Sequence, residues 1–140
     1  MTGLYRNTHV ASLYQKSDIA KGTTADDTLS LPFVDDFSTG YGNPDSRKWS
    51  DRDVYINDTY STHQPTTGIA TLDALSDKGY LYETASSQTF EADHLTSKPI
   101  DLNYPPSGNI WLSFFYQAGG TGDLPELADS LVLHFYSPVD

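Results

Sequence analysis

The sequence predicts an all-β fold, an antiparallel β-sandwich of the jelly-roll kind. Short apolar or alternating runs are separated by loops rich in glycine, proline, asparagine and aspartate, which is typical of sandwiches and barrels. No stretch of about ten or more residues shows the apolar period of an amphipathic helix. Aromatic residues make up 13% of the chain, and this content favours half-buried pleated surfaces and argues against disorder.

The predicted strands follow one another from the first third of the chain to its end. The earliest contains Pro32, so it is an edge strand or begins after that proline. A later edge strand is interrupted by Pro99. The segment 110–117 is apolar on both faces, which predicts a central strand in a two-layer structure, and 130–136 is the next best strand. The predicted runs are 29–37, the latter part of 49–57, 68–73, 80–82, 93–102, 110–117 and 130–136.

We divide the chain into a flexible lead-in over residues 1–30 and one sandwich domain over residues 31–140. The lead-in is polar and holds no apolar period, and a chain of 140 residues fits one domain. A strand that is buried on one face needs a facing sheet, and the apolar run 130–136 lies close to the last residue. We therefore expect the chain to be an N-terminal portion of the sandwich, which continues beyond residue 140 in a longer natural protein. An open sheet edge would favour pairing with another chain.

Charge and composition exclude several classes of function. The formal net charge is −11, from 19 acidic and 8 basic residues, which argues against nucleic acid and anionic membranes as partners. No apolar run approaches the roughly 20 residues of a membrane-spanning helix, and no signal-peptide core is visible in residues 1–21. Cysteine is absent, so disulfides, thiolate metal sites and cysteine nucleophiles are excluded.

Asp51 and Asp53 are the first candidate ligands. Their i, i+2 spacing would place both carboxylates on one face of a strand, where they could bind Ca²⁺ with Asn57 or form an acid–base pair. The glycine and the final glutamate of an EF-hand loop are missing. The simpler interpretation is surface charge with capped turns.

Aromatic side chains are the second candidate feature. Trp49, Tyr55 and Tyr60 lie in or near predicted loops, where rings with an apolar body and a polar tip could stack on sugars. The alternative is that they serve only the structure. No histidine pair has zinc-site spacing, and no nucleophile elbow, P-loop or dinucleotide fingerprint occurs, so no catalytic residue is predicted. Asn57 opens an Asn-Asp-Thr sequon, which matters only in a eukaryotic secretory pathway.

Seven short motifs stand in order along most of the chain. They are LPFVDDFS (31–38), WSDRDVYIN (49–57), PTTGIATLDAL (65–75), LTSKPIDL (95–102), LSFFYQ (112–117), GDLPE (122–126) and DSLVL (129–133). This order resembles the N-terminal domain of large Bacteroidetes cell-surface proteins that the type IX secretion system exports, often labelled gliding-motility-associated. The resemblance implies a concanavalin-like or MAM-like jelly roll, in a class linked to adhesion or glycan contact and not to catalysis. It offers no catalytic residues to carry over.

The resemblance also implies two sites. In jelly rolls of that class a structural Ca²⁺ can lie between an Asp-Phe strand and a later acidic loop, which implies Asp36 together with Asp129. The alternative for the acidic loop is a solvated surface. Asp27-Thr28-Leu29 resembles the O-glycosylation pattern of Bacteroidetes, so Thr28 is a candidate modification site.

The expected function is a non-catalytic structural or adhesion module of a large exported protein, outside the cell or on its outer surface. Its expected partners are other domains of that protein, other cell-surface proteins, or a second chain at an open sheet edge. Neither nucleic acid nor membrane insertion is expected, and no cofactor is expected apart from a structural Ca²⁺. The second hypothesis is a carbohydrate-binding module that uses loop aromatics and Ca²⁺. The third is a part of a secreted hydrolase.

Overall fold

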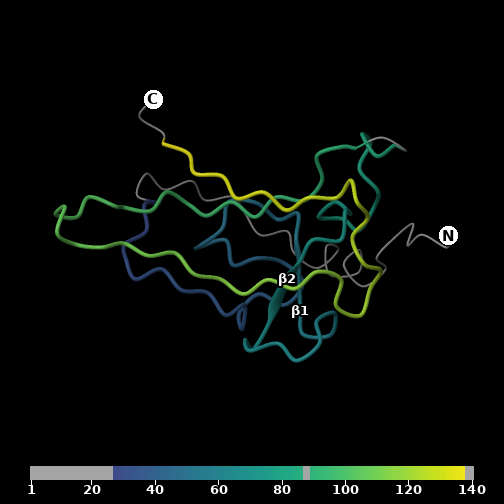
Figure 1. Ribbon diagram of the computed structural model, residues 1–140, viewed down its shortest axis with the longest axis horizontal. Coiled ribbons are helices and arrows are strands. Elements are labelled where there is room, and N and C mark those ends of the chain that lie inside the picture. The colour runs from purple at the N-terminus through teal and green to yellow at the C-terminus, as the bar shows by residue number, and fades with distance from the viewer. Residues whose placement is uncertain (1–26, 87–88, 138–140) are drawn as a thin grey trace.

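The computed structural model describes residues 27–86 and 89–137, and this part of the chain holds no helix. Strand β1 spans Tyr55–Asn57 and strand β2 spans Ile69–Thr71 (Figure 1). They pair antiparallel, with Tyr55 opposite Thr71 and Asn57 opposite Ile69. The predicted β-rich character is confirmed for the described residues, which hold paired strands and no helix. The two facing sheets of a sandwich stay a prediction. In the same residues no helix has the length and hydropathy needed to cross a membrane.

Isolated bridges extend the pairing on the side of β1 away from β2 and around residues 96–101. The N–H of Gly42 donates to the carbonyl of Ile56 at 2.8 Å, so β1 lies between Gly42 and β2. Leu29 forms a parallel bridge with Ile100, and Trp49 forms an antiparallel bridge with Ser97. Pairing in the described chain therefore begins at Leu29. Residues 1–26 of the predicted lead-in lie outside the described residues.

The buried core is small and centred on β1. Val54, Tyr55 and Ile56 are buried at successive positions, so both faces of this strand are covered. Their β-branched and aromatic side chains suit such a strand. Gly68, just before β2, donates its N–H to the carbonyl of Asp36 at 2.9 Å, and a Cβ at this position would overlap the carbonyl oxygen of Phe37. Only glycine allows the segment containing Asp36 to lie this close to the sheet.

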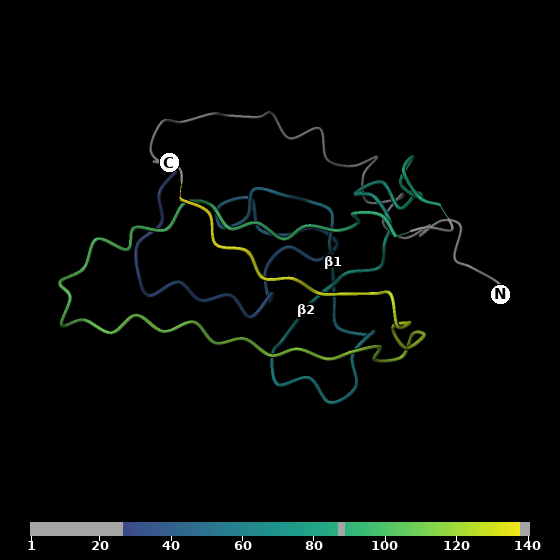
Figure 2. The same cartoon turned by 45° about the horizontal axis from the view of Figure 1, so that its top comes forward.

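The two most apolar segments differ from their prediction. Residues 108–118 and 130–137 are extended and run in opposite directions along the long axis (Figures 1 and 2). Within the described chain neither 110–117 nor 130–136 belongs to a strand, and every residue in 101–118 and 121–137 is exposed. The prediction that 110–117 is a buried central strand is wrong for this structure. The physical reason is that no described segment pairs with it or covers it.

One end of segment 110–117 is fixed to the body of the molecule. The Gln117 side chain accepts from the N–H of Thr62 at 2.9 Å, and its amide donates to the Thr62 hydroxyl at 2.9 Å. The N–H of Thr121 donates to the carbonyl of Tyr60 at 2.7 Å. The apolar segment is therefore tethered to the loop that follows β1 while its own length stays exposed.

Candidate functional site

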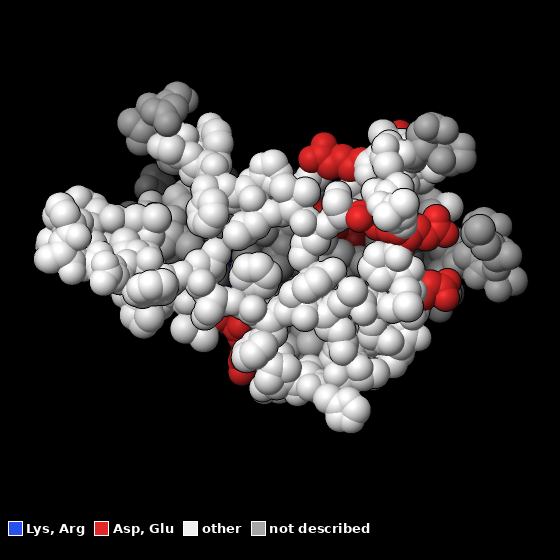
Figure 3. Space-filling model, viewed as in Figure 1, with Lys and Arg blue, Asp and Glu red and all other residues white. Residues whose placement is uncertain are grey.

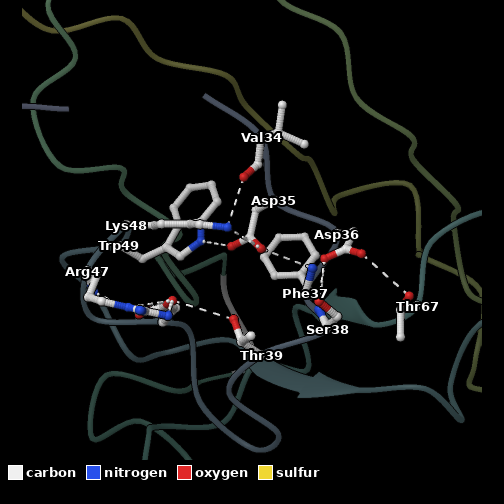
Figure 4. Close-up of polar contacts among 11 residues, drawn as sticks. Val34, Asp35, Asp36, Phe37, Ser38, Thr39, Arg47, Lys48, Trp49 and Thr67 are labelled. Carbon is white, nitrogen blue, oxygen red and sulfur yellow. Dashed lines mark hydrogen bonds and ion pairs between the residues drawn. The ribbon is translucent and has the colours of Figure 1, made fainter. Parts of the chain in front are cut away.

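A polar cluster surrounds Asp35, whose side chain is only 4% exposed (Figure 4). Lys48 Nζ donates to Asp35 Oδ1 at 3.0 Å and to the carbonyl of Val34 at 2.9 Å. Trp49 Nε1 donates to Asp35 Oδ2 at 2.6 Å, and the N–H of Phe37 donates to Oδ1 at 3.1 Å. Both carboxylate oxygens are thus occupied by donors from this chain. Asp35 joins the segment 33–38 to the turn that carries Lys48 and Trp49.

The ring of Trp49 is part of the same cluster. It packs edge-on against Phe33, with ring centroids 5.4 Å apart, and stacks on Phe37 at 5.9 Å. Such aromatic pairs add stability beyond the area that they bury. Trp49 was predicted as a sugar-stacking residue, and the structure instead places its ring between two phenylalanines and its N–H on Asp35.

Asp36 points away from Asp35, toward Thr67, as Figure 4 shows. Its Oδ1 accepts from both the hydroxyl of Ser38 at 2.7 Å and the N–H of Ser38 at 3.1 Å. These hydrogen bonds favour the ionised form and lower the pKa of Asp36. The opposite directions of the two neighbouring carboxylates agree with the alternation expected of extended backbone.

A small cavity of about 170 Å³ lies beside Asp36 and β1. Polar residues of its lining are Ser38, Asp58 and Thr67, and Tyr41, Phe37 and Ile56 also line it. These groups suit a small polar ligand such as one sugar ring. The cavity is smaller than the ~300–1,000 Å³ typical of ligand pockets. Sequence reasoning did not select Asp58 or Thr67, because nothing in their local pattern signals that they meet.

The first pair of predicted calcium ligands is engaged in contacts within the chain. Asp51 Oδ2 accepts from the N–H of Thr96 at 2.8 Å. Asp53 Oδ2 lies 3.5 Å from His94 Nδ1, and His94 Nε2 lies 2.9 Å from Glu91. The carboxylate of Glu91, and to a smaller extent that of Asp53, raises the pKa of His94. Asp51 and Asp53 therefore contact the segment 91–96.

The second pair shows no calcium geometry either. Asp129 Oδ2 accepts from the N–H of Glu126 at 2.7 Å, which closes a turn within the acidic loop. Asp36 binds Ser38, as described above. In residues 27–86 and 89–137 no three His, Asp or Glu side chains are grouped so that they could hold a metal ion. The four predicted ligands are not brought together, and the calcium hypothesis gains no support from this geometry.

The other predicted stacking residues form a row with Tyr41. The ring of Tyr55 lies 6.5 Å from Tyr41 and 5.9 Å from Tyr60, both edge-on. Tyr55 is only 7% exposed, and burial raises its pKa. Its ring has no open face for a sugar, and Tyr60 is half-buried. Tyr41 is the exposed member of this row.

The two candidate modification sites differ in accessibility. Asn57 is 1% exposed, and its amide nitrogen donates to the Thr71 hydroxyl at 2.8 Å. Its amide oxygen accepts from the N–H groups of Thr59 and Tyr60, each at 3.0 Å. The sequon amide is thus enclosed in the folded chain. Thr28 is exposed, and its O-glycosylation stays a prediction.

Two further carboxylates, Asp45 and Asp93, accept hydrogen bonds within the chain. Asp45 forms an ion pair with Arg47 at 2.7 Å, and this guanidinium holds the pKa of Asp45 at about 2. Asp93 accepts from the hydroxyl of Tyr82 and from the N–H of Ala74, each at 2.8 Å, and burial raises its pKa. Both carboxylates therefore act as structural acceptors.

Comparisons of the chain with family models, with curated proteins and with solved structures found no match. Its function is therefore inferred from its own residues. The described residues include a small cavity beside Tyr41 and an extended apolar surface over 110–117 and 130–136.

Proposed function

We propose that the chain is a non-catalytic structural or adhesion module of a secreted or cell-surface protein, with a β-sandwich fold, that acts through contacts with other polypeptides. The observation that carries the proposal is the exposure of the apolar side chains in 110–117 and 130–136. Exposed apolar patches larger than a few hundred Å² are typical of protein contact sites in soluble proteins. A surface of this kind binds protein in preference to a small charged ligand.

The polar clusters support the same proposal. Asp35 and Asp93 each accept hydrogen bonds from distant parts of the chain, and Asp45 accepts several from Arg47, two residues away. A carboxylate whose oxygens are occupied in this way is poorly placed to act as a general base, which needs a free oxygen within reach of a substrate proton. These residues maintain the shape of the module.

A carbohydrate-binding module is the second candidate, and the cavity beside β1 is the observation that favours it. Ser38, Asp58 and Thr67 supply hydrogen-bonding oxygens there, and Tyr41 supplies an exposed ring. A sugar would stack on Tyr41 and exchange hydrogen bonds with the oxygens.

Glycan-array binding of the purified chain, with Ca²⁺ and with EDTA, separates the two candidates. We expect no glycan to bind above background in either buffer, and we expect Ca²⁺ to leave the melting temperature unchanged, since an ion that binds only the native state would raise it. Tyr41→Ala is the matched variant for the cavity. A glycan that binds the wild-type chain and is lost in Tyr41→Ala would overturn the protein-contact proposal in favour of carbohydrate binding.

A further inference from the structure

We propose that residues 110–116 pair antiparallel with the same residues of a second copy of the chain, about a two-fold axis at Ser113. The inference rests on the proposed protein-contact function and names its partner. It follows from four properties of the segment: exposure, area, charge and register.

Both faces of segment 110–117, and its backbone edges, are open to a partner. Trp111 and Phe115 are 86% and 78% exposed, and Leu112 and Phe114, which alternate with them, are 58% and 61% exposed. The backbone is extended, and no described residue forms a strand with it. Such a segment is a free template for β-pairing.

The apolar area is large enough for a stable dimer. Six large apolar side chains in 110–116 and five in 131–136 are between 44% and 86% exposed. Fully buried aromatic side chains hide about 150–250 Å² each, so this set offers on the order of 1,000 Å² per chain. A standard protein interface buries about 800 Å² per partner. The apolar area exposed on 110–116 and 131–136 together is therefore comparable with what one partner buries in a standard interface.

The charge distribution favours self-association at this surface over others. A net charge of −11 opposes contact between two copies in general. Neither 110–117 nor 130–136 contains Asp, Glu, Lys or Arg. The titratable side chains of 130–136 are His134 and Tyr136. In Figure 3 the carboxylates gather mainly at one end of the visible face, and most of that face is uncharged. Repulsion between copies is therefore weakest here.

The sequence of the segment is self-complementary about Ser113. In an isologous contact residue i meets residue j and j meets i. An axis at Ser113 places Trp111 opposite Phe115 and Leu112 opposite Phe114. Aromatic and apolar cross-strand pairs of this kind stabilise antiparallel sheets. Ser113, a small residue, lies on the axis and faces the same serine of the second copy.

Disulfide trapping tests the register directly, because the chain has no cysteine of its own. In an antiparallel pair, opposite Cα atoms are ~4.5–5.5 Å apart, within the range that a disulfide spans. Under mild oxidation we expect Ser113→Cys to form a covalent dimer at least about tenfold faster than Ser46→Cys, because pairing raises the effective thiol concentration. Ser46 is an exposed serine in the turn before Arg47, so Ser46→Cys is the matched control.

Sedimentation velocity of the unmodified chain over a range of concentrations gives an independent readout. We expect a dimer that the double variant Trp111→Asp, Phe115→Asp converts to monomer. Val34→Asp, at another exposed apolar position, should stay dimeric. A wild-type monomer at every concentration, together with equal trapping rates for the two cysteine variants, would overturn the dimer. The protein-contact function would then stand with a different polypeptide as partner, whereas Tyr41-dependent glycan binding would overturn that function whatever the oligomeric state.

Discussion

Asp35→Ala should destabilise the protein by about 3 kcal/mol, at the low end of the cost of breaking a buried ion pair. The substitution leaves Trp49 Nε1 without its acceptor and Lys48 Nζ with only the carbonyl of Val34, and it removes the contact to the N–H of Phe37. The cost stays at the low end because the Lys48 side chain is 30% exposed and can turn to water. Urea denaturation followed by tryptophan fluorescence measures the loss in the free energy of unfolding.

Asp36→Ala is the matched control for this experiment. Asp36 is the same residue type one position away, but it is exposed and its partners Ser38 and Thr67 also reach water. Its loss should cost much less than the loss of Asp35, because water can replace hydrogen bonds made at an exposed position. Equal destabilisation by the two variants would contradict the role given to Asp35.

Asn57→Ala should destabilise the protein by about 2–4 kcal/mol, because it removes several hydrogen bonds made by one buried amide. Its side chain donates to the Thr71 hydroxyl in β2 and accepts from the N–H groups of Thr59 and Tyr60. One amide thus joins β1 to β2 and fixes the loop that holds residues 117–121. Thermal and urea unfolding measure the effect.

Asn109→Ala controls for the loss of an asparagine side chain. Asn109 is exposed in the segment before 110–117, so its replacement should change the free energy of unfolding by less than about 0.5 kcal/mol, as is usual for a surface substitution. An Asn57→Ala variant as stable as Asn109→Ala would mean that β1, β2 and the following loop do not depend on this amide.

Local pattern predicted some of these features well. The short strands at the end of 49–57 and in 68–73 are present as β1 and β2, because β-branched and aromatic residues there match a pleated surface. The opposite directions of Asp35 and Asp36 are likewise those of neighbouring residues in extended backbone. Both features depend on neighbours in the sequence.

Features that depend on distant segments could not be predicted from the local sequence pattern. Trp49 was taken for a loop ring because nothing nearby shows that Phe33 and Phe37 enclose it. Asp51 was taken for a ligand because its spacing does not show that the N–H of Thr96 meets it. The apolar character of 110–117 predicts that it needs cover, but the cover must come from another segment or another chain.

The central claim is that 110–117 and 130–136 form a surface that one chain leaves open. Hydrogen–deuterium exchange of the Trp111→Asp, Phe115→Asp variant, in a solution where it sediments as a monomer, tests this claim most directly. We predict slow exchange for the amides of β1 and β2 and fast exchange for those of 110–117 and 130–136. Protection of 110–117 equal to that of β1 in a monomer would contradict the claim, because the segment would then already be covered within one chain.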